Sequence, residues 1–260
     1  MKMRLLPLLL LALPAMAAAD APPPADTAPA VLMPTVVARF PHDREAFTEG
    51  LIWHRGYLYE SVGLEGRSDV RRVDLATGRV MARGTIPPGV FGEGLAAWKG
   101  GLVSLTWHGG TAYRWNAATL RRTGTAHYRG EGWGLTTLGD SLVRSDGSAT
   151  LTVHDPITFA VRRRIAVTLN GKPVDQLNEL EAVDGAILAN IWRAPFIVRI
   201  DPASGRVTAI VDLRAIVAEI GISDDIEAVA NGIAWDAAKR RLFVTGKRWP
   251  TMFEISLPKG

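Results

Sequence analysis

The stretch FGEGLAAWKGGLVSLTWHGG, residues 91–110, contains the complete pattern of a β-hairpin. An apolar run after Glu93 leads to the polar turn at residues 99–101, and a second apolar run ends at Trp107. Two short apolar runs around a glycine-containing turn are typical of paired antiparallel strands. We therefore expect a hairpin centred on Gly100, with Glu93 and Trp107 facing each other at its open end.

The same pattern occurs five times along the chain. The copies begin at Glu49, Glu93, Trp133, Asn178 and Asn231, with spacings of 44, 40, 45 and 53 residues. Four copies continue with a third strand, a polar turn and a fourth strand. Four strands per repeat at this period indicate a β-propeller blade. The alternative, a β-sandwich with accidental repeats, accounts less well for the regular spacing.

The fifth copy ends without an outer strand, and the segment PTVVARFPH, residues 34–42, is a strand without a blade. Pairing the two would close the ring and remove an exposed sheet edge. The sequence therefore predicts an all-β, five-bladed β-propeller whose ring is closed by an N-terminal strand that completes the last blade. The clearest helix candidate is short, Leu213–Ile220.

The N-terminus has the pattern of an export signal. Lys2 and Arg4 precede an apolar stretch, Leu5–Leu13, that is too short to span a bilayer, and small residues follow. We expect residues 1–19 to be a cleaved signal peptide, the alternative being an anchor helix. Residues 20–35 are rich in proline and alanine and should form an unstructured leader, and residues 36–260 should form the catalytic propeller.

Composition excludes several classes of function. The net charge of +4 falls to about +2 when Lys2 and Arg4 are removed, and the other basic residues are scattered, so nucleic acid is not an expected partner. The chain has no cysteine, which excludes disulfides and thiol chemistry in an exported protein. We expect an exported monomer, periplasmic or secreted, with no membrane contact after cleavage of the signal.

The repeat also predicts a pocket where the hairpins open. The inner ring should contain Glu49, Glu93, Trp133, Asn178 and Asn231, and their expected cross-strand neighbours are Gly63, Trp107, Gly147, Trp192 and Lys247. The glycines beside Glu93 should let a ligand approach its carboxylate. Structural roles are the alternative: Glu49 and Glu93 could accept backbone hydrogen bonds, Lys247 could balance a carboxylate, and tryptophans are often core residues.

At these residues the chain resembles the plant and bacterial type of glutaminyl-peptide cyclotransferases. The matching motifs are FTEGL (47–51), FGEGL (91–95), LTW ending at Trp107, EGWGLT (131–136), NELE (178–181), ANIW ending at Trp192 and VTGKRWP around Lys247. Any one motif is weak, but seven in order at blade spacing are specific. The resemblance implies a secreted propeller that converts N-terminal glutamine of peptides or proteins to pyroglutamate with release of ammonia.

The resemblance also implies roles for individual residues. It puts the catalytic carboxylate at Glu93, which would act as general base and then as general acid. Lys247 and Asn178 are the donors that could meet the negative charge on the amide oxygen. The substrate-binding positions are Phe47, Glu49, Phe91, Trp107, Trp133 and Trp192. Plant members tend to have glutamine where this chain has Glu49, so Glu49 could either tighten amine binding or raise the pKa of Glu93.

The sequence indicates no metal in the reaction. Its five histidines show no ligand spacing, so we expect no required cofactor, while a structural calcium ion is compatible with the many oxygen ligands. Two rival functions stay open at this point. One is a calcium-dependent lactonase of the six-bladed kind, and the other is a non-catalytic propeller that binds peptides.

Overall fold

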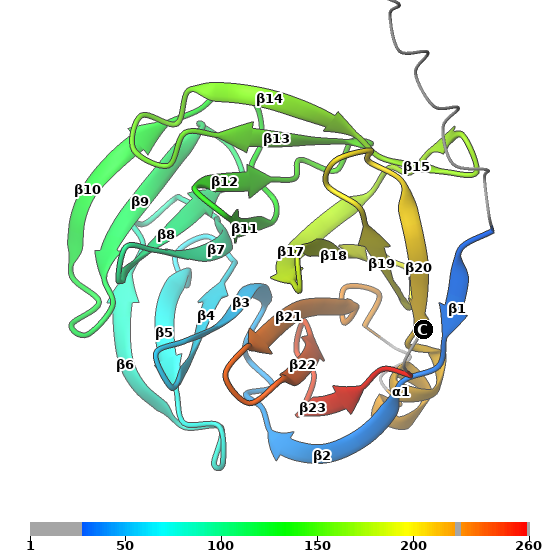
Figure 1. The fold of residues 1–260 in the computed structure, drawn as a ribbon. Helices are drawn as coiled ribbons and strands as arrows, with labels where there is room; N and C mark the ends of the chain where they lie inside the picture. The colour runs from blue at the N-terminus through cyan, green and yellow to red at the C-terminus, as the bar shows by residue number, and fades with distance from the viewer. Residues whose placement is uncertain (1–27, 222–224, 259–260) are drawn as a thin grey trace, which may run out of the picture.

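The computed structural model describes residues 28–221 and 225–258. The predicted signal peptide and the first part of the predicted leader lie outside the described residues. The described chain forms five β-sheets that are arranged as blades around a central axis (Figure 1). The prediction of an all-β, five-bladed propeller is confirmed.

Each blade runs from an inner strand beside the axis to an outer strand at the rim. Blade I contains β3 (Thr48–His54), β4 (Tyr57–Val62), β5 (Asp69–Val73) and β6 (Val80–Thr85). Blade II contains β7 (Gly92–Trp98), β8 (Gly101–Thr106), β9 (Thr111–Asn116) and β10 (Arg122–His127). Blade III contains β11 (Leu135–Leu138), β12 (Ser141–Arg144), β13 (Thr150–His154) and β14 (Val161–Ala166).

The last two blades include strands from the N-terminal segment. Blade IV contains β17 (Leu177–Val183), β18 (Ala186–Ile191), β19 (Phe196–Ile200), β20 (Val207–Asp212) and, at its edge, β1 (Ala30–Leu32). Blade V contains β21 (Ala230–Asp236), β22 (Arg241–Gly246), β23 (Thr251–Ser256) and β2 (Thr35–Pro41). A small hairpin of β15 (Thr168–Leu169) and β16 (Lys172–Pro173) lies between blades III and IV in the chain.

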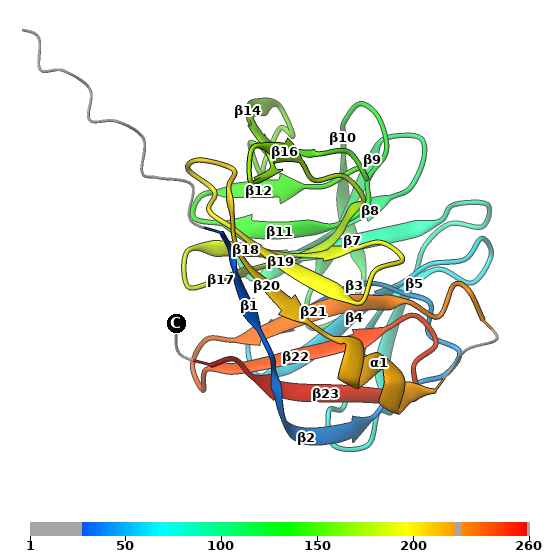
Figure 2. The ribbon, with the colours of Figure 1, turned by 90° about the vertical axis from the view of Figure 1, so that its right-hand side faces the viewer.

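The ring is closed as the sequence predicts. Strand β2 pairs antiparallel with β23, from Thr35 opposite Ser256 to Pro41 opposite Thr251. The strand β1 was not predicted: it pairs parallel with β20 and lies within the stretch assigned to an unstructured leader, so that assignment is wrong over Ala30–Leu32. The N-terminal segment therefore joins the outer edges of two neighbouring blades (Figure 2).

The predicted short helix is also present. Helix α1 (Arg214–Ile220) begins one residue later than expected and connects blades IV and V. It ends at Gly221, whose φ of 67° lies in the left-handed region that glycine adopts without strain at a helix C-terminus. Within the described ranges, no helix has the length and apolar character needed to cross a lipid bilayer.

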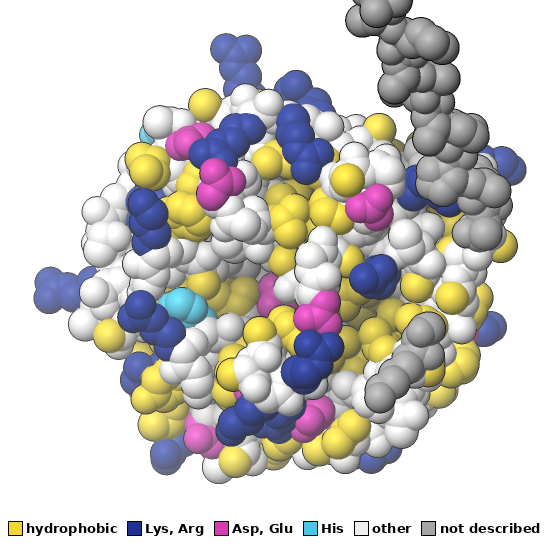
Figure 3. Space-filling view, viewed as in Figure 1, with side chains coloured by type: hydrophobic (Ala, Val, Ile, Leu, Met, Phe, Trp, Pro, Cys, Tyr) yellow, Lys and Arg dark blue, Asp and Glu magenta, His cyan; other side chains and the backbone are white. Residues whose placement is uncertain are grey.

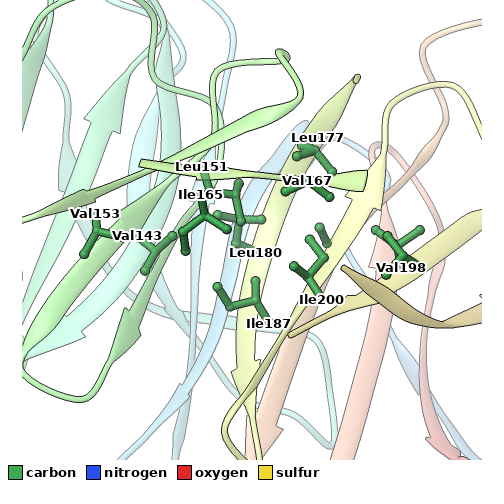
Figure 4. Close-up of a cluster of buried hydrophobic side chains, with 12 residues drawn as sticks. Val143, Leu151, Val153, Ile165, Val167, Leu177, Leu180, Ile187, Val198 and Ile200 are labelled. Atoms are coloured by element: carbon green, nitrogen blue, oxygen red, sulfur yellow. The ribbon is translucent and has the colours of Figure 1, made fainter. Parts of the chain in front are cut away.

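The hydrophobic core is divided among the junctions between blades. Five buried clusters each lie between one pair of neighbouring blades, and a sixth, smaller cluster includes Phe47 and Val62. At the junction of blades III and IV, Leu151 and Ile165 face Leu180 and Ile187 (Figure 4). Because each blade packs on both neighbours, the blades support the ends of the inner strands from all sides of the axis.

Candidate active site

Four inner strands have a β-bulge near their start. The register shifts between Thr48 and Gly50 in β3, Gly92 and Leu95 in β7, Leu177 and Leu180 in β17, and Ala230 and Ile233 in β21. These bulges contain Glu49, Glu93, Asn178 and Asn231, which are four of the five predicted inner-ring residues. A bulge interrupts the ladder and changes the direction of a side chain. The repeat therefore presents a polar residue at the same end of the axis in four blades, an end that we call the mouth.

The turns and bulges overturn the predicted cross-strand pairs. In blade II the turn consists of Lys99 and Gly100, with φ of 46° and 83°, so the hairpin is not centred on Gly100. With the bulge, this shifts the register by two residues, and the Trp107 N–H donates to the Phe91 carbonyl at 3.0 Å. Backbone hydrogen bonds likewise put Gly63 opposite Phe47, Trp133 opposite Ser145, Trp192 opposite Gln176 and Lys247 opposite Val229.

The predicted site residues nevertheless meet in one cavity, of about 450 Å³. It is lined by all nine of them: Phe47, Glu49, Phe91, Glu93, Trp107, Trp133, Asn178, Trp192 and Lys247. Asn231 is fully buried beside this cavity and donates from Nδ2 to Oε2 of Glu49 at 3.2 Å. In the space-filling view, the face is hollowed near the axis, and both basic and acidic side chains surround the hollow (Figure 3).

Five aromatic residues line the cavity. Trp133 and Trp192 pack edge to face with ring centroids 5.7 Å apart, and Phe91 packs in the same way on Trp107 at 5.5 Å. The Lys247 ammonium lies 4.4 Å from the centroid of Phe47. Such walls can hold a short aliphatic chain and also favour a cation.

Two buried carboxyl groups line this cavity. Glu49 and Glu93 are 1% and 5% exposed. Lys247 Nζ donates to Oε1 of Glu49 at 2.7 Å, so the ammonium pairs directly with Glu49 and acts on Glu93 only through its charge. Burial and then the charge of Glu49 hold the pKa of Glu93 well above its ordinary value. Burial also raises the pKa of Glu49, although Lys247 opposes that shift.

Two polar atoms at the cavity are buried without a hydrogen-bond partner in the described part of the chain. They are Oε2 of Glu93 and Oδ1 of Asn178. Buried polar atoms in proteins are nearly always paired, so an unpaired carboxyl oxygen and an unpaired amide oxygen in one cavity indicate a polar ligand. An amide can also turn to present its NH₂ group, which makes Asn178 a donor as well as an acceptor.

The glycine beside Glu93 has a different role from the predicted one. A Cβ on Gly94 would lie 2.5 Å from the Leu135 nitrogen and 2.6 Å from the Trp133 oxygen. The missing side chain therefore makes room for the inner strand of the next blade and does not open a path for a ligand. Gly50 serves the same purpose, because its Cβ would lie 2.5 Å from the Leu95 nitrogen.

Sequence reasoning missed four residues of the lining: Leu64, Arg193, Glu227 and Arg248. Three of them come directly after a predicted cross-strand neighbour: Leu64 after Gly63, Arg193 after Trp192 and Arg248 after Lys247. Each of the three has a positive φ, of 86°, 60° and 59° respectively. Left-handed backbone is costly for residues other than glycine and is concentrated at functional sites. Their shared position in the repeat was the signal that could have identified them.

An ion pair and a cation–π contact lie beside Trp192 in the cavity lining. The Arg193 guanidinium lies 4.3 Å from the Trp192 ring centroid and pairs with Glu227 at 2.6 Å. In residues 28–221 and 225–258, no group of three or more His, Asp or Glu side chains is placed to hold a metal ion.

Comparisons with known proteins agree on one family. A family model described as glutamine cyclotransferase matches residues 8–257. A protein of Arabidopsis thaliana described as glutaminyl-peptide cyclotransferase is 40% identical over 230 residues, which cover 85% of this chain and 70% of that protein. The crystal structure of Myxococcus xanthus glutaminyl cyclase superposes with a TM-score of 0.84 at 38% identity, covering 88% of this chain and 98% of that one.

Proposed function

The chain belongs to the glutamine cyclotransferase family, and from this premise we propose how its mouth cavity performs the reaction. The protein is a glutaminyl-peptide cyclotransferase, which converts an N-terminal glutaminyl residue to pyroglutamate and releases ammonia. The observation that carries the mechanism is the buried, unpaired Oε2 of Glu93 inside an aromatic cavity. Five blades and this family also argue against the rival six-bladed lactonase.

The first task of the site is to fold the substrate side chain back on its own amine. Nucleophile and electrophile belong to one residue, so the enzyme needs to fix a conformation and does not need to bring two molecules together. Trp107, Trp133 and Trp192 would enclose the two methylene groups, with Phe47 and Phe91 completing the wall. The α-amine would then lie toward Glu93, which has no other partner for Oε2 in the described chain.

The second task is proton transfer, which we assign to Glu93. As the α-amine attacks the side-chain amide carbon, the new C–N bond forms and the amine loses a proton to the Glu93 carboxylate. The same proton then passes to the amide nitrogen, the old C–N bond breaks, and ammonia leaves. The enzyme ends with the protons with which it began. The raised pKa of Glu93 suits this exchange, because the pKa of an α-amine is near 7.7 to 8.0.

The third task is to meet the negative charge that develops on the amide oxygen. Lys247 and Asn178 line the same cavity and supply an ammonium and an amide donor. We propose that both groups stabilise the tetrahedral intermediate. Since a positive charge and a proton carrier are then already present, the reaction should not need a transition metal.

Mass spectrometry of a short peptide with N-terminal glutamine tests this function. We expect the purified protein to remove one ammonia from the peptide, with and without a metal chelator. The same peptide with an acetylated N-terminus lacks the nucleophile and should stay unchanged. Loss of activity on chelation would overturn the metal-free mechanism, and the absence of ammonia loss under every condition would overturn the enzyme assignment for this chain.

We further propose that the protein is exported and acts as a monomer on peptides or proteins. Support for export is the pattern of residues 1–19, a short basic start followed by an apolar stretch and small residues. The mass of the mature protein, purified from cell fractions and medium, tests the cleavage site and shows whether the protein is periplasmic or secreted.

A further inference from the structure

The carboxylate of Glu131 lies behind two tryptophans of the cavity wall and has no part in the mechanism above. Glu131 lies in the loop between β10 and β11, and its Oε2 accepts hydrogen bonds from the indole N–H groups of both Trp107 and Trp133, each at 2.9 Å. Trp107 follows the second strand of blade II, whereas Trp133 precedes the first strand of blade III. A single oxygen atom therefore connects cavity walls from two blades.

The loop that carries Glu131 is itself anchored. The guanidinium of Arg144 is buried and donates to the main-chain carbonyl groups of Glu131 and Arg129. Arg144 also lies 4.9 Å from the ring centroid of Tyr128. A residue on a loop would normally be a poor support for a binding site, but here a buried side chain of β12 fixes its backbone.

Trp107 depends on such support more than the other wall residues. It is 37% exposed, so packing alone does not enclose it. Its ring is bounded by Phe91 on one side and by His108, which stacks on it with centroids 4.2 Å apart. The Nδ1 atom of His108 also lies 3.5 Å from Oε1 of Glu131, so both carboxylate oxygens of Glu131 face groups at this wall.

We propose that Glu131 is a positioning residue that sets the spacing and orientation of the Trp107 and Trp133 indoles, and thereby the fit of the glutaminyl side chain between them. This proposal rests on the proposed function for its effect on substrate, but not for its effect on the indoles. An indole N–H is a donor only, so a shared acceptor sets the direction of both N–H bonds, while Phe91 and His108 limit rotation of the Trp107 ring. The charge of Glu131 strengthens each hydrogen bond.

Nuclear magnetic resonance tests the structural half without any substrate. The chain has eight tryptophans, and each gives one indole N–H signal. In Glu131→Ala, we expect the signals of Trp107 and Trp133 to move together while those of the buried Trp115 and Trp249 stay in place. Unchanged Trp107 and Trp133 signals would overturn the proposal, whatever the activity of the protein.

Kinetics with a peptide that begins with glutamine test the functional half. Glu131→Ala should raise KM by about tenfold or more and change kcat much less, because uniform binding is lost. Glu131→Gln retains an oxygen that can accept from both indoles and should keep KM within about threefold of the unmutated protein. Glu131→Asp keeps the charge but withdraws the acceptor, and should resemble Glu131→Ala.

The variants separate positioning from a charge effect and from a general loss of structure. Glu65→Gln alters an exposed glutamate that does not line the cavity and should have no effect. The proposal would be overturned if Glu131→Ala kept the KM of the unmutated protein or lost only kcat. It would also be overturned if Glu131→Gln raised KM as much as Glu131→Ala. If Glu131→Ala fails to fold, Glu131→Asp and Glu131→Gln provide the same comparison.

Discussion

Glu49 and Glu93 line one cavity as buried carboxyl groups, and Glu49 pairs with the Lys247 ammonium at 2.7 Å, whereas no ion pair joins Glu93 to a described residue. The ionised form of Glu49 therefore disfavours ionisation of Glu93, whose own burial acts in the same direction. Of the two roles that the sequence left open for Glu49, this arrangement supports the second, in which Glu49 raises the pKa of Glu93.

Replacing Glu49 by glutamine should move the working pH range of the enzyme. Glu49→Gln removes the neighbouring negative charge, so the pKa of Glu93 should fall and the ionised base should be present at lower pH. We expect the acid limb of the kcat/KM profile to shift to lower pH and the rate near neutral pH to rise. An unshifted acid limb would show that Glu49 does not control the ionisation of the catalytic group.

Replacing Lys247 should affect stability and catalysis together. Lys247→Met leaves the buried Glu49 without its countercharge, and breaking such a pair costs about 3–5 kcal/mol. The loss should be smaller at acid pH, where Glu49 can take up a proton. Loss of the donor to the amide oxygen should lower kcat by about 10²–10³-fold. Denaturant titration and steady-state kinetics measure the two effects.

The double variant Glu49→Gln/Lys247→Met separates those effects. Both charges of the pair are removed, so no unpaired buried charge remains at position 49. The unfolding free energy should therefore recover toward that of the unmutated protein. Its kcat should stay low, because the donor is still missing. A kcat that recovers with stability would mean that Lys247 acts only as the partner of Glu49.

The close approach of inner strands at the axis makes Gly94 intolerant of a side chain. A Cβ at this position would lie 2.5 Å from the Leu135 nitrogen, which belongs to the next blade. We expect Gly94→Ala to lower the unfolding free energy by about 1–3 kcal/mol, the typical cost of overpacking. The control is Gly124→Ala on an outer strand, where the nearest atom would be 3.7 Å away. Equal stability of the two variants in denaturant titrations would contradict this explanation.

A buried carboxyl group near the axis should make the fold sensitive to alkali. Glu179 is fully buried and accepts hydrogen bonds from the N–H groups of Leu51 and Ile233, at 3.2 and 2.9 Å. Burial, and then the charge of Glu181, raise the pKa of Glu179 well above its ordinary value. Since the folded state binds the proton more tightly than the unfolded chain, this contribution to stability is complete below the unfolded pKa and is lost as pH rises through the folded one.

Glu179→Gln tests this pH dependence. The amide cannot ionise, so the unfolding free energy of the variant should fall less than that of the unmutated protein as pH rises above the ordinary glutamate pKa of about 4.3. The variant should be less stable near neutrality, because the amide nitrogen cannot accept one of the two backbone hydrogen bonds. If the unfolding free energies of the two proteins changed with pH in parallel, Glu179 would not take up a proton on folding.

The repeat and the family resemblance together predicted which residues meet, but not how they are paired. All nine predicted site residues line the cavity because equivalent positions of a propeller repeat converge on one axis. The pairing of Glu93 with Trp107 was wrong because a β-bulge has no strong sequence signal, and the turn at Lys99 and Gly100 could be centred in two ways. A two-residue error in register preserves the face on which a side chain lies, so the predicted residues still reach the same cavity.

The repeat gave no indication of the role of Glu131. This residue lies in the loop between β10 and β11, and exposed charges are common in loops and carry little information. Strand β1 was missed because the proline- and alanine-rich composition around it resembles that of a disordered leader. Its pairing with β20 depends on tertiary contact, which local composition does not reveal.

The central claim is that Glu93 carries the proton between the two nitrogen atoms of the substrate, and turnover by Glu93→Gln tests it most directly. The amide has nearly the same shape but can neither accept nor release this proton. We predict that Glu93→Gln still binds a peptide that begins with glutamine, while kcat for ammonia release falls by about 10²–10⁴-fold. A variant that binds the peptide and keeps kcat within about tenfold of the unmutated protein would contradict the claim.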